Sequence, residues 1–154
     1  EGHLEGLLTN SQKQLVRGMF NTAAQSVIKV MIPQSEITGV TRTTDAAQIM
    51  QLAKQNQLSF IPIRSREKQS EWTGYIKLVD LITSPAPIIP AVYNMPRLQS
   101  DFSMLESLYL LRNSASAYGA IYENEKQLGI VSQLDLVKAL CSPTGPLMLK
   151  ARVS

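Results

Sequence analysis

The chain has too few cysteine and histidine residues for several classes of site. Its 154 residues include one cysteine, Cys141, and one histidine, His3. A single cysteine excludes a disulfide within the chain and any multi-cysteine metal site, and it fits a reducing compartment. Neither residue has a second partner of the right type nearby. We therefore expect no metal site and no catalytic role for either residue.

Long apolar runs are also missing. No stretch approaches the roughly 18 apolar residues that cross a bilayer. The segment LITSPAPIIPAV is interrupted by Pro85, Pro87 and Pro90. A basic region followed by an apolar one, typical of a signal peptide, is absent from the first residues. We expect this piece to be soluble, and a start without Met suggests a fragment of a longer protein.

Positive charge and aromatic residues are sparse. Fifteen Lys and Arg residues against twelve Asp and Glu give a net charge of +3, and aromatic residues make up 6% of the chain. The one basic cluster, Arg64, Arg66 and Lys68, is interpreted as part of a solvated loop. This composition predicts no nucleic-acid partner, while 44% hydrophobic and 18% charged residues are typical of a globular protein.

The first half of the chain predicts an amphipathic helix and then a small α+β unit. Apolar pairs recur every four residues over 15–28, with Thr9 and Gln12 as a candidate capping box. A short apolar run over 27–33 follows, then a helix over 43–57 capped by Thr43 or Thr44. Strand-like runs at 58–64 and 73–78 and a short helix at 79–83 complete the unit, after which the proline-rich segment 83–90 is interpreted as a linker.

The second half repeats this order. It predicts a strand at 91–94, a helix at 100–114 capped by Ser100 or Asp101, strands at 117–123 and 128–132, and a helix at 133–140. Gly74 and Gly129 are 55 positions apart, as are Asp80 and Asp135. Each βαββα unit of about 55 residues is too small for a comfortable core, so we expect the two sheets to pack against each other.

These motifs together resemble the cystathionine-β-synthase (CBS) domain pair, or Bateman module. The phrases VIKVMIPQSEI, SFIPIR, GYIKLVDLI and GIVSQLDLV are similar to the CBS pair of the CorC/HlyC/CNNM family of membrane-anchored proteins, over residues 5–141. The resemblance implies two tandem CBS repeats related by a pseudo-two-fold axis and preceded by the amphipathic helix. We expect a linker and helix at 1–26, repeats at 27–84 and 88–141 that form one module, and a tail at 142–154.

The resemblance also implies a function. It suggests a non-catalytic regulatory module on the cytoplasmic side of the cell membrane, attached to a transmembrane domain linked to magnesium or other cation transport. Such modules commonly form homodimers, and many bind AMP or ATP, the latter with Mg²⁺. No cofactor is expected beyond this ligand.

Ser132 and Asp135 are the leading candidates for nucleotide contact. An ionised Asp can accept hydrogen bonds from both ribose hydroxyls, and a Ser three residues earlier lies at the first turn of the same helix. The helix N-terminus also favours an anion. The same spacing describes a helix cap, so the motif alone leaves both interpretations open. The expected surroundings are Gly129, Ile130 and Val131 behind the helix, with Ile32, Pro33, Ile61 and Pro62 in the cleft between the repeats, where core packing is the alternative.

The first repeat has a poorer version of this motif. Asp80 keeps its place, but Lys77 stands where the second repeat has Ser132, so we interpret Lys77 and Asp80 as a degenerate second site. In the resembling proteins that bind nucleotide, a Thr and an Arg commonly occupy the positions of Ile32 and Phe60. Their loss should weaken a polyphosphate more than a monophosphate.

Two further hypotheses remain open. A structural dimerisation module whose pocket has lost its ligand is the main alternative to the regulatory module. An enzyme ranks last, because the sequence has no Ser-His-Asp set, no carboxylate pair with a supporting base and no Walker loop.

Overall fold

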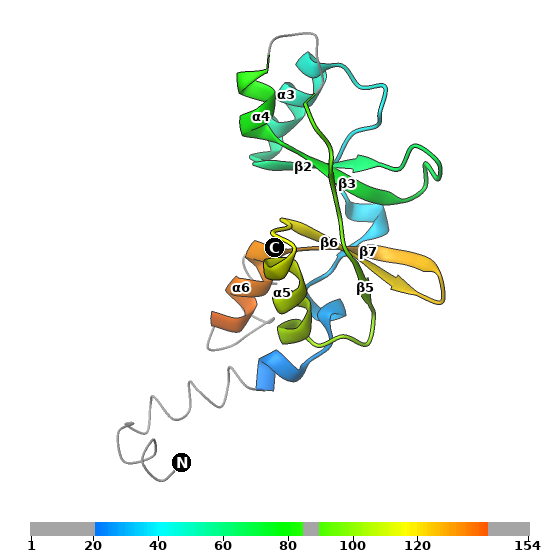
Figure 1. The fold of residues 1–154 in the computed structure, drawn as a ribbon, viewed down its shortest axis with the longest axis vertical. Coiled ribbons are helices and arrows are strands. Elements are labelled where there is room, and N and C mark those ends of the chain that lie inside the picture. Colours follow the sequence, from blue (N-terminus) through cyan, green and yellow to red (C-terminus); the bar gives the residue numbers. More distant parts are fainter. Residues whose placement is uncertain (1–20, 85–89, 142–154) are drawn as a thin grey trace.

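The computed structural model, which describes residues 21–84 and 90–141, contains two β-sheets, each accompanied by a pair of α-helices (Figure 1). This arrangement confirms the predicted α+β fold of two repeats. In chain order the elements are η1 (Val27–Val30), β1 (Ile32–Pro33), η2 (Gln34–Glu36), α3 (Ala46–Asn56), β2 (Phe60–Arg64), β3 (Trp72–Lys77) and α4 (Leu78–Thr83), then β4 (Tyr93–Asn94), β5 (Arg97–Gln99), α5 (Met104–Asn113), β6 (Tyr118–Glu123), β7 (Lys126–Ser132) and α6 (Gln133–Cys141).

Each repeat contributes its leading strand to the sheet of the other. β1 pairs antiparallel with β7, which places Ile32 opposite Ile130. β4 pairs in the same way with β3, which places Tyr93 opposite Tyr75. The strand orders are therefore β1-β7-β6-β5 in one sheet and β2-β3-β4 in the other. Because of this exchange, each sheet contains strands from both repeats.

The strand register confirms the internal duplication. Pro62 lies opposite Tyr75 in the first hairpin, and Ala120 lies opposite Ile130 in the second. The first members of these pairs are 58 positions apart and the second members 55, because the second hairpin turn is shorter by three residues. That turn is Asn124–Glu125, where φ values of 52° and 64° give the backbone of a type I′ turn.

An apolar cluster joins the two sheets, as the duplication predicts. Its buried members come from both repeats: Trp72, Tyr75, Met95, Tyr118, Ala120, Tyr122 and Ile130. Tyr75 is 1% exposed, and its ring meets that of Tyr118 edge to face at 5.8 Å between centroids. Separate apolar clusters lie between each sheet and its own helices. The inter-sheet cluster therefore fixes the two repeats as one body.

The cap of α3 differs from the prediction. The helix begins after Asp45, whose carboxylate accepts a hydrogen bond from the Gln48 backbone N–H at 2.8 Å, and not after Thr43 or Thr44. The Thr44 hydroxyl instead accepts from the backbone N–H of Thr41 at 3.1 Å in the preceding turn. The prediction failed because three adjacent residues could all serve as caps, and the turn uses the first two.

The cap of α5 also lies later than predicted. The helix begins after Ser103 rather than Ser100 or Asp101, with a complete capping box between Ser103 and Glu106 at 3.0 Å in both directions. The bond from the Ser103 backbone N–H, with a smaller effect from the Ser103 hydroxyl, lowers the pKa of Glu106 because it stabilises the carboxylate. The Ser100 hydroxyl donates to Glu123 instead. The two observed caps are 58 positions apart, the same separation as the strands.

The start of the described chain is fixed to the second repeat. Residues 21–24 are helical, and Val27 is fully buried in the cluster that α5 and α6 form with their sheet. The Val27 N–H donates to the Phe102 carbonyl at 2.9 Å, and the Met104 N–H donates to the Gln25 carbonyl at 2.8 Å. The leading segment is therefore part of the core of the second repeat.

The strand in this segment is shorter than predicted. The strand expected within 27–33 is confined to Ile32–Pro33, because Val27–Val30 forms a 3₁₀ turn whose Ile28 N–H is capped by the Ser26 hydroxyl. The predicted capping pair Thr9 and Gln12 lies outside the described residues, as does the tail 142–154.

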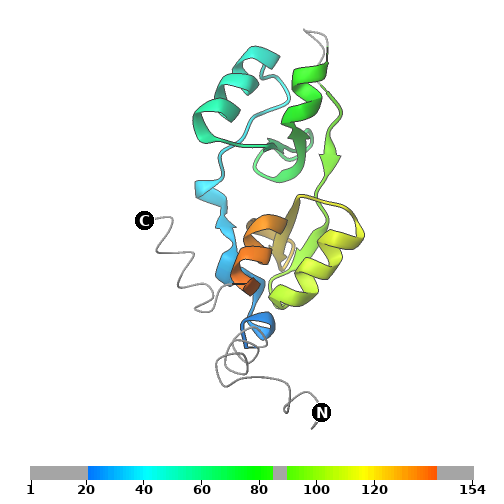
Figure 2. The ribbon, with the colours of Figure 1, turned by 90° about the vertical axis from the view of Figure 1, so that its left-hand side faces the viewer.

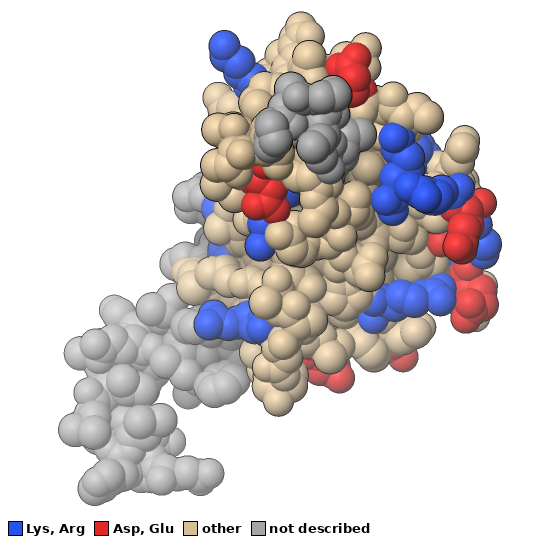
Figure 3. All heavy atoms as spheres, turned by 45° about the horizontal axis from the view of Figure 1, so that its top comes forward, with Lys and Arg blue, Asp and Glu red and all other residues tan. Residues whose placement is uncertain are grey.

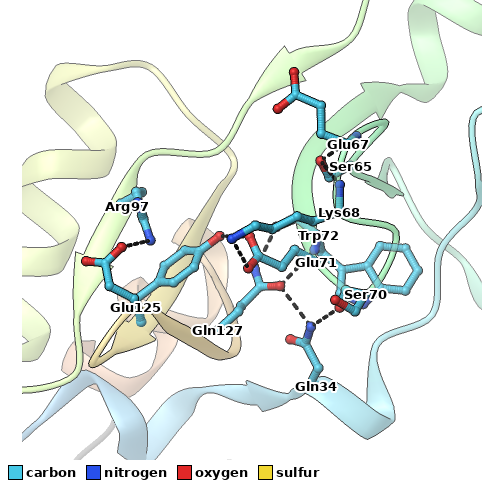
Figure 4. Close-up of polar contacts among 11 residues, drawn as sticks. Gln34, Ser65, Glu67, Lys68, Ser70, Glu71, Trp72, Arg97, Glu125 and Gln127 are labelled. Atoms are coloured by element: carbon cyan, nitrogen blue, oxygen red, sulfur yellow. Dashed lines mark hydrogen bonds and ion pairs between the residues drawn. The ribbon is translucent and has the colours of Figure 1, made fainter.

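The two repeats are also joined by a polar junction on the hairpin side (Figure 4). The Gln127 side chain, 5% exposed, accepts from the Trp72 backbone N–H and donates to the Trp72 carbonyl, both at 2.7 Å. The Gln34 amide donates to Gln127 Oε1 at 2.8 Å. Gln127 therefore pairs the backbone of β3 in the way that a neighbouring strand would.

The surface shows no long run of one charge on the face in view. Lys and Arg side chains form small separate groups there, several of them beside Asp or Glu (Figure 3). Among the helices of residues 21–84 and 90–141, none combines the length and apolar content needed to span a membrane.

Candidate nucleotide site

The predicted cap at the start of α6 is half formed. Ser132 ends β7, and its Oγ accepts a hydrogen bond from the Asp135 backbone N–H at 2.9 Å. The reciprocal bond of a capping box, from the Ser132 N–H to the Asp135 carboxylate, is not made. Because a hydroxyl has one proton and two lone pairs, the cap leaves the O–H of Ser132 able to donate to a ligand oxygen. The cap and a ligand contact are therefore compatible.

The Asp135 carboxylate is half-buried and has no hydrogen bond or ion pair to any part of the chain that the structure describes. Its negative charge is one of two causes that raise the pKa of Tyr118 to about 12, after the larger effect of burial. Asp135 therefore lies close enough to Tyr118 to act on its phenol, and it keeps its acceptor capacity for another partner.

Ser132 also lines an open cleft of about 710 Å³ between the two repeats. The cleft lies on the side where the α-helices of both repeats are found, which faces the viewer in Figure 2. Its described lining is Gln57, Leu58, Ser59, Phe60, Tyr75, Lys77, Arg112, Ala115, Ser116, Ala117, Tyr118, Ser132, Gln133, Leu134 and Val137. This lining contains two cationic side chains and no carboxylate, so it favours an anionic ligand.

The residues expected behind the helix belong to β7, and none of them lines the cleft. Ile130 and Val131 are fully buried, and Gly129 is buried against β1. A Cβ atom at Gly129 would collide with the Ile32 carbonyl oxygen, so only glycine lets β1 approach β7 this closely. Ile32 and Pro33 thereby pair with Ile130 and Gly129 of β7. Neither of them lines the cleft, so their contact with a nucleotide stays a prediction.

Ile61 and Pro62 lie elsewhere than expected. Both are buried in β2, and neither lines the cleft. Ile61 belongs to the apolar cluster between the first sheet and its own helices, and Pro62 uses its carbonyl to accept from the Val40 N–H at 2.9 Å. Core packing accounts for both side chains, and their contact with a nucleotide stays a prediction.

The first repeat has a different arrangement at the equivalent place. The Tyr93 hydroxyl donates to the Asp80 carboxylate at 2.9 Å, and this bond is the main reason that the pKa of Tyr93 is raised. The Lys77 ammonium lies 4.3 Å from the centre of the Tyr93 ring. Lys77 also lines the cleft. Asp80 does not, and neither does its counterpart Asp135, which lies one residue beyond the lining residue Leu134.

A second cleft of about 590 Å³ lies at the hairpin ends, and both of its cationic side chains are paired with carboxylates: Lys68 with Glu71 at 3.8 Å, and Arg97 with Glu125. The Tyr122 hydroxyl donates to Glu71 at 2.8 Å, and Arg97 lies over the Tyr122 ring at 3.8 Å. Arg97 also pairs with Glu125 at 3.6 Å (Figure 4). Among the described residues that line the helix-side cleft, no carboxylate pairs with Lys77 or Arg112. The helix-side cleft is therefore the better candidate site for an anionic ligand.

Solved structures similar to this chain share the fold. The CBS domain of a bacterial CNNM/CorC family Mg²⁺ transporter superposes with a TM-score of 0.76, over 89% of this chain and 87% of that one, at 13% identity. The same kind of domain in complex with ATP gives a TM-score of 0.73 at 14% identity, over 85% and 96% of the two chains. A CBS-domain pair with bound AMP from Klebsiella pneumoniae gives 0.60 at 16% identity, over 76% and 98%.

The chain has the fold of a CBS-domain pair. No family model matches its sequence, and no curated protein matches it either. At 13–16% identity the three structures establish the fold of this CBS pair and leave its ligand to be argued from its own residues.

Sequence reasoning missed three residues at the sites of this CBS pair: Arg112, Tyr118 and Tyr93. Tyr118 lies 58 positions after Phe60, whose carbonyl accepts its hydroxyl at 3.0 Å across the cleft. Aligning the two repeats at this position would have found it. Tyr93 could not be found in this way, because its role depends on the exchange of β4 into the first sheet.

Proposed function

We propose that this CBS pair is a non-catalytic regulatory module of the CorC/CNNM type, and that it binds an adenine nucleotide at the start of α6. In this proposal the module lies on the cytoplasmic side of the cell membrane, attached to a transmembrane domain linked to magnesium or other cation transport. Two modules associate as a homodimer. The likeness of the fold to CBS domains of such transporters, one of them in complex with ATP, supports the choice of ligand and setting.

The observation that carries the proposal is the Asp135 carboxylate at the first turn of α6. It makes no hydrogen bond or ion pair with any described residue. A ribose offers two adjacent O–H donors, and a carboxylate can accept both as charge-assisted bonds. The Ser132 O–H lies one turn earlier and can reach the ribose or a phosphate oxygen. The two residues together match the hydroxyl pattern of a nucleoside.

The charge of the cleft favours the phosphate end of the ligand. Lys77 and Arg112 line it together with the N-terminal residues of α6. These two positive charges lie at positions other than that of Phe60, where the resembling proteins often have an Arg. The affinity order of AMP, ADP and ATP therefore measures how far these two side chains replace the missing guanidinium.

The packing of α6 provides a route from the ligand to the preceding chain. Leu136, Ala139 and Leu140 of α6 share a core with Val27 of η1. The Ser26 hydroxyl further ties this segment to the Ser100 carbonyl at 2.8 Å. A ligand that favours one position of α6 would therefore favour one position of residues 21–30, with an energy limited to its difference in affinity between the two positions.

Calorimetric titration with AMP, ADP and ATP, each with and without Mg²⁺, tests the proposal. We expect saturable binding of at least one nucleotide, together with a rise in melting temperature. Absence of heat and of thermal shift at millimolar concentrations of all three would remove the nucleotide part of the function.

A structural dimerisation module is the second candidate, favoured by apolar side chains exposed on three helices. Val79 and Ile82 of α4, Tyr109 of α5 and Leu134 of α6 are each 60–66% exposed. Exposed apolar side chains of this size are typical of an association surface. This candidate predicts a dimer in sedimentation whose dissociation constant is unchanged by nucleotide and by Asp135→Ala.

A further inference from the structure

Tyr93 fills the first repeat's counterpart of the candidate nucleotide site. Its hydroxyl donates to Asp80, which occupies the position of Asp135 in the duplication. Its ring stacks on Tyr75 with 5.5 Å between centroids and 24° between planes, and Lys77 covers it at 4.3 Å. The side chain is held by a carboxylate, an aromatic ring and a cation at once.

The second repeat has a different residue at the matching position. Tyr93 of β4 pairs with Tyr75 beside Gly74, and Ile32 of β1 pairs with Ile130 beside Gly129 in the same register. The leading strands are thus equivalent, one carrying a tyrosine and the other an isoleucine. Isoleucine has no hydroxyl, so it cannot donate to Asp135, which explains why only one of the two equivalent carboxylates is satisfied by the chain itself.

The contacts of Tyr93 are those that a nucleoside would need. A ribose hydroxyl and a phenol are both O–H donors to a carboxylate, and a base and a phenol ring can both stack on an aromatic side chain. Tyr93 and a nucleoside cannot both bond to Asp80 and stack on the same face of Tyr75 at one time. An occupant from the same chain has a high effective concentration, and a free ligand must displace it.

We propose that Tyr93 is a built-in occupant of the nucleoside position in the first repeat, so that this CBS pair binds one nucleotide and not two. The inference rests on the proposed function for the site at Asp135. It assigns the loss of the first site to a residue of the exchanged strand as well as to Lys77. Changing Tyr93 and Lys77 to their counterparts in the second repeat should therefore open a second site.

The test is the number of nucleotides bound per chain, measured by equilibrium dialysis with AMP for the wild type and for the double variant Lys77→Ser/Tyr93→Ile. We expect one for the wild type and two for the double variant. Adding Asp135→Asn to the double variant should return the number to one, and adding Asp80→Asn as well should abolish binding. Lys54→Ser, at an exposed lysine of α3 outside the cleft lining, is the matched control for Lys77→Ser and should leave the number at one.

The outcomes separate this inference from the proposed function. Two nucleotides on the wild type, or one on a double variant that retains its circular dichroism and melting transition, would overturn the inference and leave the nucleotide function standing. No binding by the wild type with one nucleotide on the double variant would support the inference and refute the site at Asp135. No binding by either would contradict both.

If the double variant does not fold, the reciprocal change Ile32→Tyr takes its place. It puts a tyrosine beside Asp135, and we expect it to reduce binding at least tenfold while the control Ile32→Leu does not. Equal binding by Ile32→Tyr and Ile32→Leu would overturn the inference.

Discussion

Gln127 and Trp72 occupy equivalent positions in the two repeats and bind each other across the pseudo-two-fold axis. The side-chain amide of Gln127 satisfies both the N–H and the carbonyl of Trp72 at 2.7 Å. One buried glutamine therefore takes the place of a backbone partner at the junction of the two sheets.

Replacing Gln127 should destabilise the whole fold. Gln127→Leu leaves the buried N–H and carbonyl of Trp72 without partners, and we expect a loss of about 2 to 5 kcal/mol in the free energy of unfolding. Urea unfolding measures the change. Gln55→Leu, at an exposed position of α3, is the control and should stay within about 0.5 kcal/mol of the wild type. Equal values for both variants would show that the junction adds no stability.

The duplication and most elements followed from the sequence, because apolar periodicity and the repeated glycine and aspartate positions determine them. The cap positions did not, since Thr43, Thr44 and Asp45 are all suitable caps and only the preceding turn selects among them. The strand Arg97–Gln99 was also missed, because three residues are too short to show a period.

The candidate site was predictable only in part. The bond from the Asp135 N–H to Ser132 followed from their spacing along the chain. The contact between Tyr93 and Asp80 did not, because it depends on a two-residue strand joining the sheet of the other repeat. Long-range exchange of this kind leaves no local pattern in the sequence.

Gly129 should tolerate a side chain less well than its counterpart Gly74. A Cβ atom at Gly129 meets the backbone carbonyl of Ile32, whereas the nearest atom to one at Gly74 is Cγ1 of Val92 at 2.7 Å, which can move with its side chain. We expect Gly129→Ala to cost more than about 3 kcal/mol and Gly74→Ala about 1 to 2 kcal/mol. Thermal and urea unfolding of the two variants give the comparison, and the reverse order would contradict the close approach of β1.

Ser132 should contribute to stability without any ligand. Ser132→Ala removes the cap of α6, and we expect it to lower the free energy of unfolding by about 1 kcal/mol. Ser132→Thr keeps a hydroxyl and should retain most of the stability that the cap provides. Urea unfolding of the nucleotide-free protein measures both. If the Ala variant were as stable as the wild type, the serine would have no structural role, and only a ligand contact would remain.

High pH should destabilise the protein through two tyrosines. Burial raises the pKa of Tyr118 to about 12, with a smaller effect from the charge of Asp135, and burial followed by the bond to Glu71 raises that of Tyr122 to about 12. An unfolded tyrosine loses its proton near pH 10. The unfolded state therefore releases protons first, and stability falls between about pH 10 and pH 12.

Urea unfolding across this range checks the effect, with a shallower decline expected for Tyr118→Phe. Phenolate absorbance provides a second check, because Asp135→Asn should lower the pKa of Tyr118 by removing the neighbouring charge. A titration curve unchanged by that substitution would mean that Asp135 does not act on Tyr118.

The most direct test of the central claim is the dissociation constant of AMP or ATP for the wild type, Asp135→Asn and Asp80→Asn. The two variants make the same chemical change at equivalent positions of the duplication. Loss of charge-assisted bonds worth about 1.5 to 3 kcal/mol should weaken binding by roughly 10- to 150-fold in Asp135→Asn. Asp80→Asn should bind as the wild type does. Equal weakening in both variants, or none in Asp135→Asn, would contradict a nucleotide site at Ser132 and Asp135.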